Sequence, residues 1–195
     1  MKNRKMIGAL LCTLALFVSG IAMGGSKEKK AGKVLAGYNA VVVEKFSVDP
    51  SARTADFPRG QEVGIQQNVV ERLNKQKVFE EVKDGLEAGA ATPVAADSTA
   101  NAPAKRAVIL SGTVIEYDKG SRAARWFVGM GAGATKVKVR FVFRDAQTGA
   151  ELLRTDRQGK FYGWIAFVGG SKEQATGEAA GDVVDRLMDD IKKNR

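Results

Sequence analysis

The chain has 195 residues with a formal net charge of +9, no histidine and a single cysteine, Cys12. The missing histidine excludes Ser–His–Asp triads, Cys–His nucleophiles and the usual zinc sites, and we expect no metal site and no cofactor. The surplus of basic residues favours polyanionic partners, although ordinary solvated lysines give the same charge balance.

The first 24 residues have the three-part layout of a secretory signal. Three basic side chains lie within the first five residues, an apolar run covers 6–18, and small residues suited to cleavage occur within 19–24. This apolar run is shorter than the ~20 residues of a membrane-spanning helix, so we expect export and cleavage of 1–24. The basic residues that follow leave an uncleaved N-terminal anchor as the alternative.

Cys12 lies inside the apolar run and follows Leu11, whereas a lipid-anchoring cysteine closes such a run after a small residue. Its position therefore argues against lipidation. After cleavage the mature chain has no thiol, so its stability depends on a packed core and not on disulfides. Residues 25–33 then form a charged leader before one domain, which we expect to span 34–195.

The first half of this domain contains three predicted elements. A run rich in β-branched residues predicts a strand over Tyr38–Val48. Apolar residues at every fourth position predict a helix over Gln61–Lys75, with Gln66 on its solvent side. Alternation of apolar and polar residues then predicts a short strand over Val78–Val82.

Residues 84–106 differ from the rest of the domain because alanines and small polar residues dominate and few side chains can form a core. We expect a flexible surface loop within the domain there, with a poorly formed helix as the alternative. Three strands are predicted after it, from their β-branched and aromatic content and their alternation. They span Ala107–Tyr117, Thr135–Asp145 and about Glu151–Tyr162.

A last helix is predicted from Ser171, whose hydroxyl is placed to cap the amide of Gln174. Its apolar stripe runs to Ile191, and basic residues within 192–195 lie where the helix dipole favours cations. The elements together predict an α+β (mixed α/β) domain in the order strand, helix, four strands, helix. We expect a single sheet of about five strands, with both helices packed on one face and the other face open.

The strand Thr135–Asp145 has two sides of opposite character. Because successive side chains of a strand point to opposite faces, the cations of this strand share one side, and the other side carries Val137, Val139, Phe141 and Phe143. The cations are Lys136, Lys138, Arg140 and Arg144. We expect this cationic row to lie on the open face of the sheet.

The most unusual segment is 121–133, in which arginines and aromatic residues precede three glycines. As a phosphate-binding loop it lacks the helix and the Gly-Lys-Ser/Thr sequence that should follow. As a membrane-touching hairpin its uncharged run Trp126–Ala134 has the length of a short membrane strand, and 161–168 offers a second apolar stretch. The third interpretation is a cluster of buried aromatic side chains beside a loop that glycines allow to fold closely.

The stretch Ser111–Ala134, the strand Val137–Arg144 and the turn Asp145–Gly149 resemble a bacterial family known as domain of unknown function number 4410. The resemblance covers 41–191, and Ser121–Gly133 is its most specific part. More distantly, the strand order and the turn are similar to the curli-secretion lipoprotein and to the N-terminal domain of TolB. The resemblance implies an envelope protein and transfers no catalytic residues, and the missing lipobox cysteine separates this chain from lipidated relatives.

These observations predict a non-enzymatic interaction module of the periplasm that acts in envelope assembly or maintenance. An association with the outer membrane is compatible with this prediction. Arginine and aromatic residues are enriched in binding hot spots, and further cations add electrostatic attraction. The predicted contact residues are Arg122, Arg125, Trp126, Phe127, Gly129, Gly131, Gly133, Lys136, Lys138 and Arg140. The expected partner is an envelope protein, or an anionic component such as lipid, lipopolysaccharide or peptidoglycan, and not nucleic acid. The alternative is an outer-membrane-associated oligomer or pore-like protein related to the curli-secretion lipoprotein.

Overall fold

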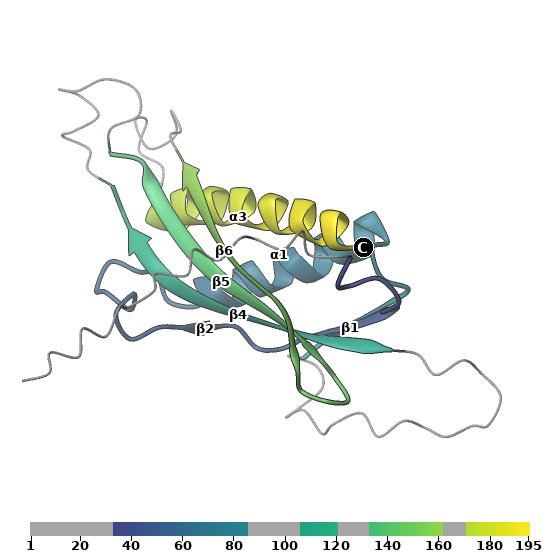
Figure 1. Cartoon of the computed structure of the whole chain (residues 1–195). Coiled ribbons are helices and arrows are strands. Elements are labelled where there is room, and N and C mark those ends of the chain that lie inside the picture. Colours follow the sequence, from purple (N-terminus) through teal and green to yellow (C-terminus); the bar gives the residue numbers. More distant parts are fainter. Residues whose placement is uncertain (1–32, 86–105, 121–132, 162–170) are drawn as a thin grey trace, which may run out of the picture. The chain divides into compact units, whose positions relative to one another are not determined.

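Within the described residues, 33–85, 106–120, 133–161 and 171–195, the computed structural model of the chain contains one six-stranded sheet and two helices (Figure 1). All of these residues belong to the unit Ala31–Arg195. The elements are β1 (Ala40–Val43), β2 (Ser47–Val48), α1 (Gln61–Gln76), β3 (Glu81–Asp84), β4 (Ala107–Asp118), β5 (Thr135–Asp145), β6 (Glu151–Phe161) and α3 (Lys172–Asn194). The predicted α+β class is confirmed.

The sheet combines parallel and antiparallel pairing. Its strands follow the order β3–β1–β4–β5–β6, and the short strand β2 pairs separately with β4. β1 is parallel to both β3 and β4, whereas β4, β5 and β6 are antiparallel neighbours. The three long strands therefore form one continuous surface, and the register of β5 decides which side chains lie next to one another across it.

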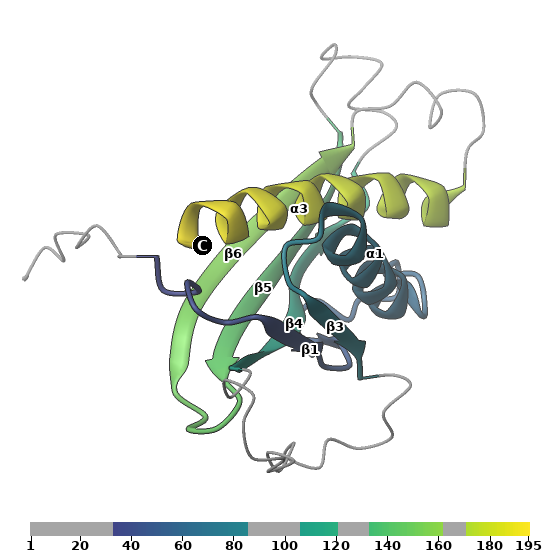
Figure 2. The same cartoon turned by 90° about the vertical axis from the view of Figure 1, so that its right-hand side faces the viewer.

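Both helices cover the same face of the sheet (Figure 2). α3 packs on β5 and β6, α1 packs on β3 and β4, and the two helices contact each other. The core between the layers includes Phe141 and Phe143 from β5, Ile65 from α1 and Leu187 from α3, which are all fully buried. The predicted arrangement of two helices on one face is confirmed, and no described element packs on the opposite face.

α3 begins where its sequence predicts. Ser171 precedes the helix, and its Oγ accepts a hydrogen bond from the backbone amide of Gln174 at 3.2 Å. The apolar stripe of the helix faces the sheet, and its fully buried members include Ala179, Val183, Leu187 and Ile191. Local capping and a 3.6-residue period thus suffice to place this element.

Two contacts hold α3 close to β6. The buried Asp190 carboxylate accepts a hydrogen bond from Thr155 Oγ1 at 3.0 Å and is also paired with the Arg157 guanidinium. Farther along β6, Gly159 lies so close to the helix that a Cβ atom there would be 1.9 Å from the carbonyl oxygen of Ala179. The ion pair and the missing side chain together set the distance between strand and helix.

The predicted strand Tyr38–Val48 is wrong in its continuity, because residues 44–46 separate β1 from β2. Phe46 turns its side chain into the core there, next to Gly112, whose missing side chain leaves room for the ring. The backbone amide of Phe46 donates to Gln66 Oε1 and not to a neighbouring strand. A long-range contact therefore creates the break, and the β-branched composition of the segment does not reveal it.

The predicted strand Val78–Val82 is wrong in its position, because β3 covers Glu81–Asp84. Val78 and Phe79 are buried in the core, in the connection that follows α1. Lys77 ends that helix in the left-handed conformation, with φ at 49°. The chain is thereby redirected into the core before its pairing with β1 begins.

Gln66 is buried, and the prediction that it lies on the solvent side of α1 is wrong. Its Oε1 accepts the backbone amide of Phe46 at 3.0 Å, and its Nε2 donates to Asp84 Oδ1 at 2.6 Å. Gln66 thus connects α1 to the break between β1 and β2 and to the end of β3. Both ends of its amide are satisfied, which is the usual condition for burying a polar side chain.

Asp145 connects the beginning of the described domain to the turn after β5. Its Oδ2 accepts a hydrogen bond from the Tyr38 hydroxyl at 2.6 Å, and its Oδ1 accepts the amides of Gln147 and Thr148, each at 2.9 Å. Arg106 lies over the Tyr38 ring, 4.2 Å from its centroid, and approaches the same carboxylate. The Tyr38 hydrogen bond, followed by those of the turn amides, holds the pKa of Asp145 well below its usual range.

We expect Asp145→Asn to destabilise the domain at neutral pH and to change the domain's acid sensitivity. Because folding lowers the pKa of Asp145, its stabilising effect is present above the unfolded-state pKa of about 3.9 and disappears as the pH falls through the folded-state value. The difference in urea midpoint between wild type and variant should therefore narrow below about pH 4. A difference that stays constant between neutral pH and strong acid would contradict this role.

Candidate functional site

The contact residues predicted from the sequence lie only partly within the described residues. Those described are Gly133, Lys136, Lys138 and Arg140; those outside are Arg122, Arg125, Trp126, Phe127, Gly129 and Gly131. The predicted signal 1–24, the leader up to residue 32 and most of the predicted loop, 86–105, lie outside as well. The site is therefore built here from the described side chains of β4, β5 and β6.

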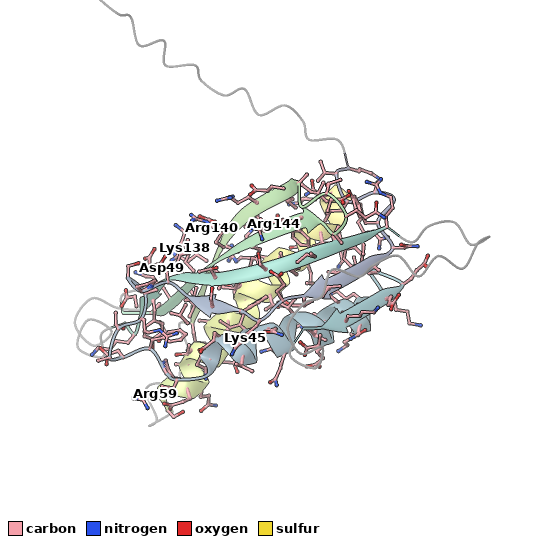
Figure 3. All side chains as sticks on the ribbon, turned by 90° about the horizontal axis from the view of Figure 1, so that it is seen from below. Lys45, Asp49, Arg59, Lys138, Arg140 and Arg144 are labelled. Atoms are coloured by element: carbon pink, nitrogen blue, oxygen red, sulfur yellow. The ribbon has the colours of Figure 1, made fainter. Side chains whose placement is uncertain are left out.

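The cationic row of β5 lies on the face of the sheet that the helices leave open. Val137, Val139, Phe141 and Phe143 are fully buried on the helix side. On the other side the four cations are partly exposed, and the apolar Val142 between Arg140 and Arg144 is buried. Figure 3 shows Lys138, Arg140 and Arg144 along this face. The predicted division of β5 into an apolar side and a cationic side is confirmed. We use the name β5 row for Lys136, Lys138, Arg140 and Arg144.

Arg140, in the middle of the β5 row, is neutralised by a neighbour on β6. Asp156 lies directly opposite in the strand register and accepts two hydrogen bonds, at 2.9 Å from Arg140 Nε and at 3.0 Å from its Nη2. This pairing lowers the pKa of Asp156 and raises that of Arg140, and the charge of Lys138 also favours the ionised Asp156 carboxylate. Arg140 is consequently a fixed partner within the sheet and adds little net charge to the face.

Lys136 is neutralised in the same way by β4. Its Nζ lies 3.2 Å from Oδ2 of Asp118, the residue opposite it in the strand register. The other carboxylate oxygen of Asp118 accepts the backbone amide of Gly120 at 2.8 Å. The Gly120 hydrogen bond first, and Lys136 second, lower the pKa of Asp118. Two of the three described cations predicted to make contacts are thus already paired.

The uncompensated charge of the β5 row comes from Lys138 and Arg144. Within the described part of the chain, Lys138 has no ion-pair partner, although Glu116 lies opposite it in the strand register. Arg144 donates to the Ser111 hydroxyl, at 3.3 Å from its Nη1, and forms no ion pair, although Glu151 lies opposite it on β6 and its charge helps to lower the pKa of Glu151. The sequence predicted Arg144 as a member of the row but not as a contact residue. Whether such a cation is paired depends on the strand register, which the sequence does not give.

Other labelled charges lie around this face without joining the row. Asp49 is held by Ser51, whose hydroxyl and amide donate to Oδ1 at 2.6 Å and 2.9 Å and lower the pKa of Asp49, with a smaller effect from Arg140. Lys45 and Arg59 lie apart from Lys138 and Arg144 in Figure 3. The candidate site is therefore the open face of β4–β5–β6. Its cations without an ion pair among the described residues include Lys138 and Arg144 of the β5 row and the exposed Lys160 of β6, opposite Lys136 in the register.

Two further chemical properties of the described part of the chain bear on its function. No group of three or more acidic, histidine or cysteine side chains there could hold a metal ion. None of the helices among those residues is long and apolar enough to cross a membrane. What the open face offers chemically is a set of hydrogen-bond donors and positive charges, several of which form no ion pair among the described residues.

Comparison with known proteins gives one family match. The family model described as domain of unknown function (DUF4410) matches residues 41–162, which span β1 through β6. No curated protein matches the chain. The resemblance to this family expected from the sequence is confirmed.

Several solved structures are similar to the chain at low sequence identity. The PelC dodecamer from Paraburkholderia phytofirmans is 17% identical, with a TM-score of 0.44 over 77% of this chain and 89% of that one. Protein XCC0632 from Xanthomonas campestris, of family DUF330, is 10% identical, with a TM-score of 0.45 over 78% and 85%. Lipoprotein GNA1162 from Neisseria meningitidis is 13% identical, with a TM-score of 0.35 over 77% and 98%.

Proposed function

The chain belongs to DUF4410, a family of domains of unknown function, and we propose that it is a non-enzymatic interaction module of the bacterial periplasm. Its role is envelope assembly or maintenance. The signal-like segment 1–24 supports export, and the absence of histidine from the whole sequence supports a binding role over hydrolytic catalysis. Segment 121–132 remains a predicted part of the contact surface, with Arg122, Arg125, Trp126 and Phe127 as its contact residues.

The observation that carries this proposal is the open face of β4–β5–β6. One face of the sheet is covered by α1 and α3, whereas the other presents Lys138 and Arg144 without acidic partners among the described residues. These two charges attract an acidic partner that does not have to displace an existing ion pair, and the acidic side chains opposite them, Glu116 and Glu151, reduce that attraction. Acidic envelope proteins, lipid headgroups, lipopolysaccharide and peptidoglycan all offer carboxylates or phosphates.

We expect Lys138→Glu with Arg144→Glu to abolish most partner capture by the full chain in its own cells. A photo-reactive amino acid at Gln158, which faces Lys138 across β5 and β6, would record what lies on the open face. Adduct yield should fall about tenfold or more in the double variant, because two attractive charges become repulsive. Mass spectrometry of the adduct identifies the partner as protein, lipid, lipopolysaccharide or peptidoglycan.

The matched control reverses the same number of charges elsewhere. Lys33→Glu with Lys75→Glu alters two exposed lysines outside the open face and should leave the adduct yield unchanged. Equal adduct yield in the wild type and in the Lys138→Glu, Arg144→Glu protein would disprove the proposed contact surface. Retention of the protein in membranes through alkaline carbonate would favour the alternative, an outer-membrane-associated oligomer related to the curli-secretion lipoprotein.

A further inference from the structure

The outer side of α3 carries a row of acidic side chains. We use the name α3 ridge for Glu178, Asp182, Asp185 and Asp189. Glu178 and Asp189 are eleven residues apart, which is about three helical turns, so they lie on one side of the helix about 16 Å apart. That side lies opposite the stripe of the helix that is buried on β5 and β6, and only Asp182 on it reaches the sheet, at the edge of β6.

Only part of the charge on the α3 ridge is neutralised. Asp182 pairs with Arg186 at 3.1 Å and also accepts the backbone amide of Lys160 at 3.2 Å. Asp185 pairs with Arg72 of α1 at 2.7 Å. Glu178 and Asp189 are exposed and have no ion-pair partner in the part of the chain that the structure describes. The ridge therefore has two free negative charges, one near each end.

The free charges of the α3 ridge and of the β5 row are complementary in sign, number and spacing. Lys138 and Arg144 are six residues apart on one side of an extended strand, which corresponds to about 20 Å. Glu178 and Asp189 are about 16 Å apart, and the reach of lysine and arginine side chains covers the difference. The two surfaces lie on opposite faces of the same domain, so one copy cannot pair them with each other.

We propose that the acidic partner of the β5 row is the α3 ridge of a second copy of this chain. This inference rests on the proposed function, because it uses the same open face and names its occupant. Two different surfaces meet in such a contact, so it is heterologous: one copy retains a free α3 ridge and the other retains a free β5 row. Assembly therefore continues from copy to copy and either closes into a ring or extends as a filament.

Sedimentation of the full chain purified from the envelope tests this contact without any substitution. We expect association at low ionic strength and loss of it at about 0.5 M salt, because exposed charge pairs are screened at short distance. A wild-type chain that remains monomeric at low ionic strength would overturn the proposal. Association that is unchanged by salt would also overturn it.

Two charge-reversal variants then identify the surfaces. One carries Lys138→Glu and Arg144→Glu, and the other carries Glu178→Lys and Asp189→Lys. None of these four side chains has an ion-pair partner among the described residues, so folding should be retained, which is checked by thermal unfolding. Each variant alone should be monomeric, because one half of every contact is repulsive.

Mixing the two variants gives the decisive result. The first variant is acidic on both surfaces and the second is basic on both, so each surface of one attracts the opposite surface of the other. The mixture should therefore associate again, with the two variants alternating. A single chain with all four substitutions should associate again, because both charges are exchanged. Continued association of either variant alone, or a mixture that contains only monomers, would overturn the proposal.

The same variants test the proposed function independently of self-association. If Glu178→Lys with Asp189→Lys changes nothing while Lys138→Glu with Arg144→Glu still abolishes adducts to another envelope component, self-association is wrong and the proposed function stands. If neither pair of substitutions changes association or adduct yield, both are wrong. The Lys33→Glu, Lys75→Glu protein should associate like wild type and thereby exclude an effect of net charge.

Discussion

Gly159→Ala is expected to destabilise the domain by about 3 kcal/mol, the upper end of the usual cost of overpacking a core. A Cβ atom at this position would lie 1.9 Å from the carbonyl oxygen of Ala179 and 2.9 Å from the backbone nitrogen of Val183. Both atoms belong to the α3 backbone, so a side-chain rotation cannot relieve the contact. The helix itself must move away from β6, and its buried stripe must move with it.

Urea unfolding of the purified domain measures this effect, with Gly177→Ala as the matched control. Gly177 lies within α3, and a Cβ atom there has no atom within 4 Å. Because alanine favours a helix interior over glycine by roughly 0.5–1 kcal/mol, the control should be neutral or stabilising. Equal stability of the Gly159→Ala protein and wild type would mean that β6 and α3 are not in close backbone contact.

Gln66→Leu is expected to reduce the free energy of unfolding by about 1–3 kcal/mol, although leucine is apolar and similar in size. Gln66 Oε1 is the acceptor for the buried backbone amide of Phe46, and leucine cannot replace it. The substitution also removes the donor to Asp84 Oδ1. The cost comes from polar groups that lose a partner in the core, and not from lost apolar contacts.

The neighbouring residue supplies the control for this prediction. Gln67 lies on the exposed side of the same helical turn, so Gln67→Leu should change stability by no more than about 0.5 kcal/mol. Thermal or urea unfolding of both variants at neutral pH is sufficient. A Gln66→Leu protein as stable as wild type would show that the connection between α1 and the β1–β2 break contributes nothing to folding.

The long elements could be predicted because their signals are local. β5 has the predicted bounds, since alternation over eleven residues defines both the strand and its two sides. α3 has the predicted start, since the Ser171 cap and the apolar stripe are properties of one short segment. The element order and the covered face of the sheet follow from burying these apolar sides together.

The errors occur where distant residues decide the local structure. The break before β2 exists because Phe46 enters the core beside Gly112, a residue of β4. The register shift between Val114 and Glu116 of β4 brings Tyr117 opposite the buried Val137, where strict alternation would not place it. Neither the break nor the shift leaves a periodic signal in its own segment.

For the candidate site, too, some features could be predicted from the sequence and others could not. The cations of the β5 row and their common side followed from the spacing of residues within one strand. Their net charge did not, because Asp118 on β4 and Asp156 on β6 neutralise Lys136 and Arg140. Arg144 became a candidate contact residue only when the structure showed that it donates to the Ser111 hydroxyl and that Glu151, opposite it on β6, pairs with Arg154 instead.

The sequence by itself determined the α+β class, the bounds of β5 and the capped start of α3, and the presence of cations on one side of β5. These features depend on periods of two and 3.6 residues and on bonds between near neighbours. The tertiary structure alone decided that Gln66 is buried, that Gly159 borders α3, and that Lys138 and Arg144 remain unpaired. The physical reason is that burial and charge pairing depend on strand register and helix placement, which join residues far apart in the chain.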